Sequence, residues 1–68
     1  MTLIKMMTIY DALKDSRNHY EDEAAKALSL GLDSLVSYYE RKFDTVADTM
    51  EEVRGEMIAK FHCNPELQ

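Results

Sequence analysis

The strongest constraint on the fold is a long series of apolar side chains at steps of three and four residues in the second half of the chain. This spacing is typical of an amphipathic α-helix, because about 3.6 residues complete one helical turn. The steps are close to a heptad repeat, which predicts a seam that packs against another helix. The sequence therefore predicts a helix over residues 34–62. The seam consists of Leu35, Tyr39, Phe43, Val46, Met50, Val53, Met57 and Phe61.

A second helix is predicted over residues 8–30. Thr8 is its expected N-cap, with Asp11 three residues later in the place of the acidic member of a capping box. The apolar stripe is thin, because residues 15–23 are mostly polar. Residues 1–6 are expected to form a loose tail, and Met6 is a candidate alternative start. The expected inner face comprises Ile9, Leu13, Ser16, Tyr20, Ala24, Ala27 and Leu28.

The segment between the two helices contains the residues of a tight turn. Gly31 suits the left-handed conformation that ends many helices, and Asp33 or Ser34 could cap the next one. A helical hairpin with its turn at residues 31–33 is therefore predicted. One continuous helix through Gly31 is the alternative, because a glycine inside a helix costs only about 1 kcal/mol relative to alanine. Pro65 should end the second helix and leave residues 64–68 loose.

With 68 residues, the chain has room for a single all-α domain with a small core. Its one cysteine, Cys63, excludes an internal disulfide and fits a reducing compartment such as the cytoplasm. No apolar run approaches the roughly 20 residues of a membrane span. A two-helix hairpin covers each apolar stripe on one side only. We therefore expect a homodimer or higher oligomer, most simply a four-helix bundle formed through the seam.

The charge balance argues against a nucleic-acid surface. Lys and Arg total 8 against 13 Asp and Glu, for a net charge of −5, whereas binding to nucleic acid depends largely on positive side chains at the phosphates. The segment Ala24–Tyr39 resembles a degenerate helix-turn-helix, so a nucleic-acid-linked regulator is an alternative function. Its second helix, however, begins with acidic and polar residues rather than phosphate-binding ones.

No motif points to catalysis, a metal or a cofactor. His62 and Cys63 are adjacent, but they lie at a predicted helix C-terminus, where the helix dipole disfavours a thiolate. Neither His19 nor His62 follows an acidic residue by three positions, as a carboxylate-bridged metal site in a bundle requires. We therefore predict a protein that is not an enzyme and holds neither metal nor cofactor.

A set of acidic residues follows one side of the second predicted helix. The simplest interpretation is a solvated outer face, and the functional one is a docking surface for a protein with a basic surface. Tyr38 is expected at its rim, where an aromatic ring with a polar tip suits a contact. A third alternative is a structural subunit of a larger helical assembly. The candidate partner-binding residues are Tyr38, Glu40, Asp44, Asp48, Glu51 and Glu52.

The segment from Met6 to Tyr20, Met-Met-Thr-Ile-Tyr-Asp-Ala-Leu-Lys-Asp-Ser-Arg-Asn-His-Tyr, resembles the start of a small early protein of lambdoid bacteriophages. Such proteins are encoded between the recombination and excision genes. The resemblance implies an all-helical protein of the bacterial host cytoplasm that binds a host protein and helps to redirect the host towards lytic development. It carries over no active-site residue.

Overall fold

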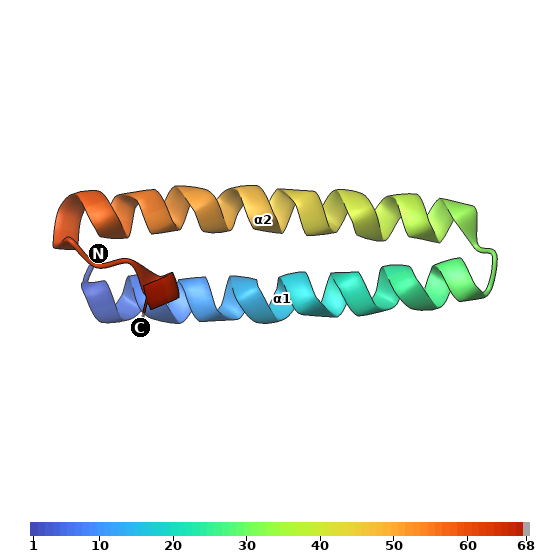
Figure 1. The fold of residues 1–68 in the computed structure, drawn as a ribbon, viewed down its shortest axis with the longest axis horizontal. Helices are drawn as coiled ribbons and strands as arrows, with labels where there is room; N and C mark the ends of the chain where they lie inside the picture. Colours follow the sequence, from blue (N-terminus) through green and yellow to red (C-terminus); the bar gives the residue numbers. More distant parts are fainter. Residues whose placement is uncertain (68) are drawn as a thin grey trace.

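Two long antiparallel helices lie side by side in the computed structural model, which describes residues 1–67 (Figure 1). Helix α1 spans Leu3–Ser29, helix α2 spans Asp33–Phe61, and a short 3-10 helix, η1, spans Pro65–Leu67. The predicted all-helical hairpin is confirmed. Both chain ends lie at one end of the hairpin, called here the terminal end, and residues 30–32 connect the helices at the opposite turn end.

Helix α1 begins earlier than the sequence suggested. Thr2 is its N-cap, and the Thr2 hydroxyl oxygen accepts a hydrogen bond from the backbone N–H of Lys5 at 3.2 Å. Thr8 lies inside the helix and donates its hydroxyl to the carbonyl of Ile4 at 2.9 Å. The predicted start at residue 8 and the loose tail at 1–6 are wrong. Met6 is only 3% exposed, so its burial against α2 holds the first turns in helical form.

The turn follows the predicted chemistry and rules out a continuous helix. Gly31 has a φ of 69°, in the left-handed region. Its N–H donates to the carbonyl of Leu28 at 3.1 Å, and the N–H of Leu32 donates to that of Ala27 at 2.9 Å. This pair of bonds is the Schellman motif, which satisfies carbonyls that a helix end would leave unpaired. Nothing lies within 4 Å of a Cβ added at Gly31, so its backbone conformation alone calls for glycine.

The boundaries of α2 differ slightly from the prediction. Leu32 occupies the N-cap position with no side-chain hydrogen bond, so capping by Asp33 or Ser34 is wrong. Asp33 is instead the first helical residue, where its charge suits the positive end of the helix dipole. At the other end His62 takes a left-handed conformation, with φ at 53°, and turns the chain back. The predicted loose segment 64–68 is ordered as η1 over 65–67, and position 68 lies outside the described residues.

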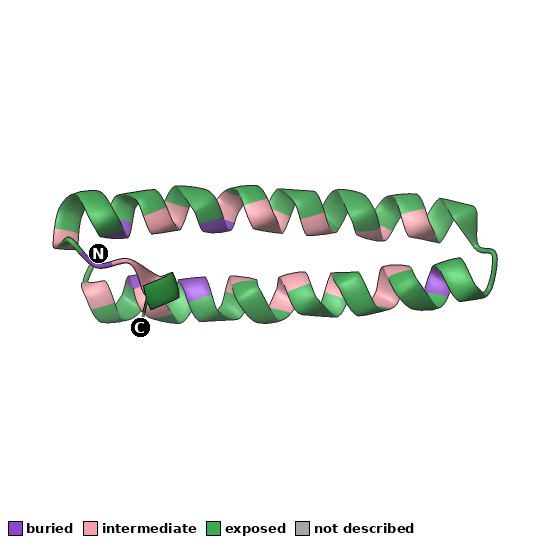
Figure 2. Ribbon diagram, viewed as in Figure 1, coloured by how far each residue is buried: buried purple, intermediate pink, exposed green. Residues whose placement is uncertain are grey.

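The buried core lies in the terminal half of the hairpin (Figure 2). Close to the turn, Ala27 is the one buried residue among those described. The difference follows from side-chain size, since the seam of α1 ends in small Ala24 and Ala27 near the turn but has larger side chains near its start. The core cluster consists of Met6, Tyr10, Met50, Met57 and Cys63, with Leu3, Met7, Leu13, Val46, Val53 and Phe61 packed against it.

The inner face of α1 follows a regular heptad phase that the sequence prediction only partly recovered. The predicted members Ile9 and Leu28 are 39% and 68% exposed, so their assignment to this face is wrong. Met6 and Tyr10 take the inward positions instead, and half-buried Arg17 occupies the polar gap. The buried and half-buried positions at alternating steps of three and four are Leu3, Met6, Tyr10, Leu13, Arg17, Tyr20, Ala24 and Ala27.

The molecule is a rod of 44 × 18 × 16 Å. Its radius of gyration is 14.3 Å, whereas a compact domain of this length has about 11 Å. A rod two helices wide can enclose little volume, which explains why the core is small and most side chains touch solvent.

Candidate interaction surfaces

The seam of α2 serves mainly as the contact between the two helices of one chain. Met50 and Met57 are 3% and 0% exposed in the single chain, because both pack against α1. Their part in an oligomer interface stays a prediction. At the turn end the seam diverges from the prediction, because Leu35 is 43% exposed while Val36 is half-buried. The remaining interface residues, Tyr39, Phe43, Val46, Val53 and Phe61, are half-buried.

Four exposed leucines lie within eight residues of sequence around the turn. We call them the leucine tip, which consists of Leu28, Leu30, Leu32 and Leu35, and they are 68%, 72%, 44% and 43% exposed. Their apolar side chains are accessible to a contact. The sequence prediction had placed two of the four, Leu28 and Leu35, in the interior. The heptad phase of each helix identifies these two residues as exposed, because neither lies at an inward position of the repeat.

The predicted acidic stripe does not act as one surface. All five carboxylates are exposed, but Glu51 accepts a hydrogen bond from Arg54 Nη2 at 2.7 Å and is therefore neutralised locally. Glu40 and Asp44 instead converge with Glu21 of α1, a residue outside the predicted set. The other two members of the stripe, Asp48 and Glu52, lie outside that convergence.

The convergence forms an acidic groove between the helices, with a volume of about 270 Å³. Glu21, Glu40 and Asp44 line it, with Ala24 and Phe43 as its apolar lining. None of the three carboxylates has a hydrogen bond or ion pair within the described chain. The groove therefore concentrates three negative charges beside a small apolar surface.

Tyrosine rings join the helices next to this groove. The Tyr20 and Tyr39 rings meet across the hairpin with centroids 6.2 Å apart, and the Tyr38 and Tyr39 rings stack edge to face at 5.3 Å. Tyr38, the predicted rim residue, is 45% exposed, and Lys42 Nζ lies 5.7 Å above its ring. Such contacts are worth about 0.5–1.5 kcal/mol beyond the area they bury.

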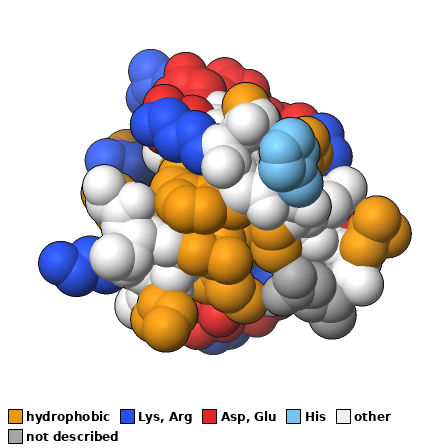
Figure 3. Space-filling view, turned by 90° about the vertical axis from the view of Figure 1, so that its left-hand side faces the viewer, with side chains coloured by type: hydrophobic (Ala, Val, Ile, Leu, Met, Phe, Trp, Pro, Cys, Tyr) orange, Lys and Arg blue, Asp and Glu red, His pale blue; other side chains and the backbone are white. Residues whose placement is uncertain are grey.

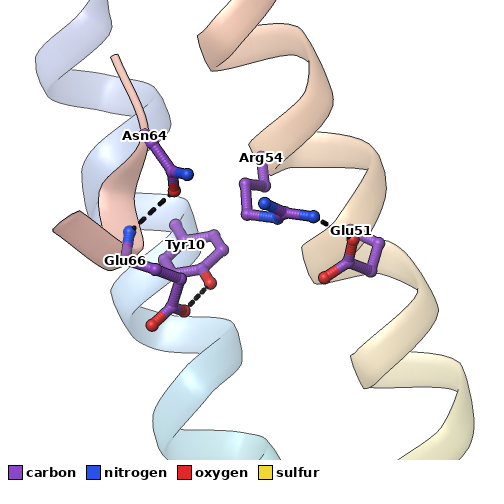
Figure 4. Close-up of polar contacts among 5 residues, drawn as sticks. All are labelled: Tyr10, Glu51, Arg54, Asn64 and Glu66. Carbon is purple, nitrogen blue, oxygen red and sulfur yellow. Dashed lines mark hydrogen bonds and ion pairs between the residues drawn. The ribbon is translucent and has the colours of Figure 1, made fainter.

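The C-terminal segment is attached to α1 by a side-chain contact. Figure 4 shows the Tyr10 hydroxyl donating to Glu66 Oε1, while the Glu66 backbone N–H donates to Asn64 Oδ1 at 3.0 Å. Burial of the ring, reinforced by the Glu66 carboxylate, raises the pKa of Tyr10 to about 12. The hydrogen bond from Tyr10 in turn lowers the pKa of Glu66. The segment thus folds back against α1 at the terminal end, where Figure 3 shows hydrophobic side chains gathered near the centre of the view.

Three basic side chains surround this contact. Lys14, Arg17 and Arg54 lie close enough to Glu66 to help lower its pKa. The hydrogen bond to Glu51 raises the pKa of Arg54. We call Lys14, Arg17 and Arg54 the basic patch. The sequence prediction overlooked it, although the Glu51–Arg54 spacing of three residues is a recognisable helical ion pair.

Cys63, one of the residues considered for chemistry, is buried in the core cluster. Among residues 1–67, no group of three or more His, Cys, Asp or Glu side chains is arranged to hold a metal ion. Neither α1 nor α2 combines the length and apolarity needed to cross a membrane.

The Ala24–Tyr39 segment has a geometry unlike that of a helix-turn-helix. DNA-binding motifs of that type set their two helices at roughly 90–120°, so that the second helix can enter a groove. Here α1 and α2 run antiparallel and side by side away from the turn (Figure 1).

Comparison with protein families, curated proteins and solved structures finds no match to this chain.

Proposed function

We propose that this chain is a small helical interaction protein without enzymatic activity, which self-associates and binds another protein through the leucine tip. The observation that carries the proposal is the exposure of four leucines around the Schellman turn. Apolar surface left in water is a favourable binding site, because burying it releases about 25 cal/mol per Å².

The overall surface supports this proposal. The chain exposes 4941 Å², whereas about 4,400 Å² is typical of a folded protein of 7.9 kDa. The excess reflects the rod shape, which leaves apolar side chains uncovered. Association with a second copy, and then with a partner, would cover this surface.

The resemblance to early proteins of lambdoid phages suggests the setting. In that setting the partner is a protein of the bacterial host cytoplasm, and binding to it would alter a host process.

A photo-crosslinking experiment tests the tip directly. A photoreactive residue is placed at position 30 in the tip, or at exposed position 12 on α1 as the matched control, and each protein is irradiated in bacterial lysate. We expect a discrete product from position 30 that unlabelled native chain competes away and that Leu30→Lys with Leu32→Lys does not. Equal products from both positions, or equal competition by the variant, would contradict binding through the tip.

A further inference from the structure

One face of the hairpin carries a charge pattern that is complementary to itself. On α1, residues seven apart occupy the same face, because seven residues make two turns with a drift of only about 20°. The row Met7, Lys14, Glu21, Leu28 therefore reads apolar, positive, negative, apolar. Read from either end, the row has apolar residues outside and opposite charges inside.

The corresponding row on α2 also has opposite charges on the two sides of its centre. At steps of seven it contains Asp33, Glu40, Ala47, Arg54 and Phe61, so only its Glu40 and Arg54 repeat the charge symmetry of the α1 row. Glu40 lies in the acidic groove with Glu21, and Arg54 lies in the basic patch with Lys14. The two rows thus share one face, called here the groove face. Its acidic part lies towards the turn and its basic part towards the terminal end.

We propose that a second copy of this chain docks on the groove face about a two-fold axis that reverses the long axis of the rod. In this arrangement Lys14 of each copy meets the acidic groove of the other beside Glu21. Arg54 of each copy likewise meets Glu40 of the other. A two-fold interface requires a patch that complements itself, and opposite charges placed symmetrically about its centre fulfil that requirement.

The position of the symmetry axis supports full overlap of the two rods. The midpoint between Glu40 and Arg54 is Ala47, the centre of α2, which spans residues 33–61. The midpoint between Lys14 and Glu21 lies within two residues of position 16, the centre of α1. If the charges were centred elsewhere on the helices, the same pairing would bring only part of each rod against the other. Ala47 also presents a small side chain at the axis, where the two copies come closest.

The size of the face is adequate for a stable dimer. Its length of 44 Å and width of 16 Å give a footprint on the order of 700 Å² per copy. Stable interfaces bury about 800 Å² per partner. At the ends, exposed Leu28 of one copy would face half-buried Met7 of the other, so that apolar contacts flank the charged centre.

The charge balance of an isolated chain fits the same arrangement. The three groove carboxylates have no positive partner within the described chain, so they repel one another. The basic patch keeps a net positive charge, since Glu66 and Glu51 offset two of its three cations. Docking would bring Lys14 to the groove and relieve that repulsion.

The proposal deepens the proposed self-association and rests on it, so the test separates the two. Sedimentation equilibrium is measured for the native chain and for two charge-reversed forms, with helicity checked by circular dichroism. The acid-reversed form carries Glu21→Lys and Glu40→Lys, and the base-reversed form carries Lys14→Glu and Arg54→Glu. We expect the native chain to dimerise, increasingly weakly as salt rises. Each reversed form alone should dimerise at least tenfold more weakly.

Mixing provides the decisive readout. An equimolar mixture of the two reversed forms pairs positive with negative at every contact, so dimers should return. The chain with all four reversals should dimerise like the native one. The matched controls change the same charges off the groove face: Asp22→Lys with Asp48→Lys, and Lys5→Glu with Arg41→Glu. Both control forms should dimerise like the native chain.

The outcomes that overturn the proposal are distinct. A native dimer that both reversed forms retain, or that the mixture fails to restore, would overturn docking on the groove face while leaving self-association intact. A native chain that sediments as a monomer would overturn both the arrangement and the self-association.

Discussion

At the scale of single residues, the two glycines have opposite roles. Gly31 has positive φ and closes the Schellman turn, whereas Gly55 lies inside α2 with nothing within 4 Å of an added Cβ. A left-handed residue other than glycine costs about 1–2 kcal/mol, while an alanine inside a helix is about 1 kcal/mol better than glycine. Alanine substitutions at the two positions therefore distinguish the cost of a left-handed backbone from the benefit of a better helix former.

We predict that Gly31→Ala lowers the free energy of unfolding by about 1 kcal/mol and that Gly55→Ala raises it by a similar amount. Urea denaturation followed by circular dichroism measures both. Equal effects of the two substitutions would contradict the assignment of Gly31 to the turn.

The pKa of Tyr10 predicts a pH dependence at the alkaline end. Its folded-state pKa of about 12 lies above its ordinary value of 10.0, so the folded chain holds the proton more tightly than the unfolded chain. The resulting stability is fully present below pH 10 and is lost as the pH rises from about 10 to 12. Over that range the free energy of unfolding should fall more steeply for the native chain than for Tyr10→Phe. Parallel curves would show that Tyr10 is not protected by burial and Glu66.

At the scale of elements, sequence reasoning succeeded where local chemistry decides and failed where packing decides. Gly31 ended α1 as predicted because the Schellman turn is local. The start of α1 was misplaced because Thr2 and Thr8 are equally good caps, and the choice depends on Met6 reaching the core. Met50 and Met57 were identified as apolar seam residues, but only partial cover by the first helix was expected, whereas the hairpin alone buries both.

The candidate surfaces were less predictable than the helices. Glu40 and Asp44 were singled out from one helix, but their convergence with Glu21 depends on how the two helices face each other. Leu28 is exposed because the heptad phase of α1 places it outside the inner face. The polar residues near Arg17 made that phase hard to recognise in the sequence.

The two threonines make the position of the helix start testable. Thr2→Ala should cost about 1 kcal/mol, because it removes the hydroxyl that accepts the N–H of Lys5. Thr8→Ala should be close to neutral, since its hydroxyl only bonds back to a carbonyl of the same helix. Thermal denaturation of both variants measures this difference. The reverse order of effects would restore a helix start at residue 8.

At the scale of the whole molecule, stability depends on a few core residues. A domain of this length is typically stable by roughly 3–10 kcal/mol in total. Met57→Ala should cost about 2–5 kcal/mol, because the side chain is fully enclosed and the thin rod cannot collapse around a cavity. Leu30→Ala at the exposed tip should change stability by no more than about 0.5 kcal/mol. Urea midpoints compare the two, and a larger effect at position 30 would place the tip in a buried interface.

The location of the core in the terminal half has a consequence for amide hydrogen exchange. In most helical hairpins the covalent turn holds one end together while the free ends open. Here Met6 and Met57, about 50 residues apart in sequence, are held together in the core at the free ends, while the turn end encloses Ala27. Local opening requires the least loss of buried surface at the turn. Within the two long helices, amide protons that flank the turn should therefore exchange fastest, and those around residues 10 and 53 should exchange slowest. Protection from exchange should thus be highest near the terminal end, where the chain is free, and should decrease towards the turn end, where the helices are covalently joined.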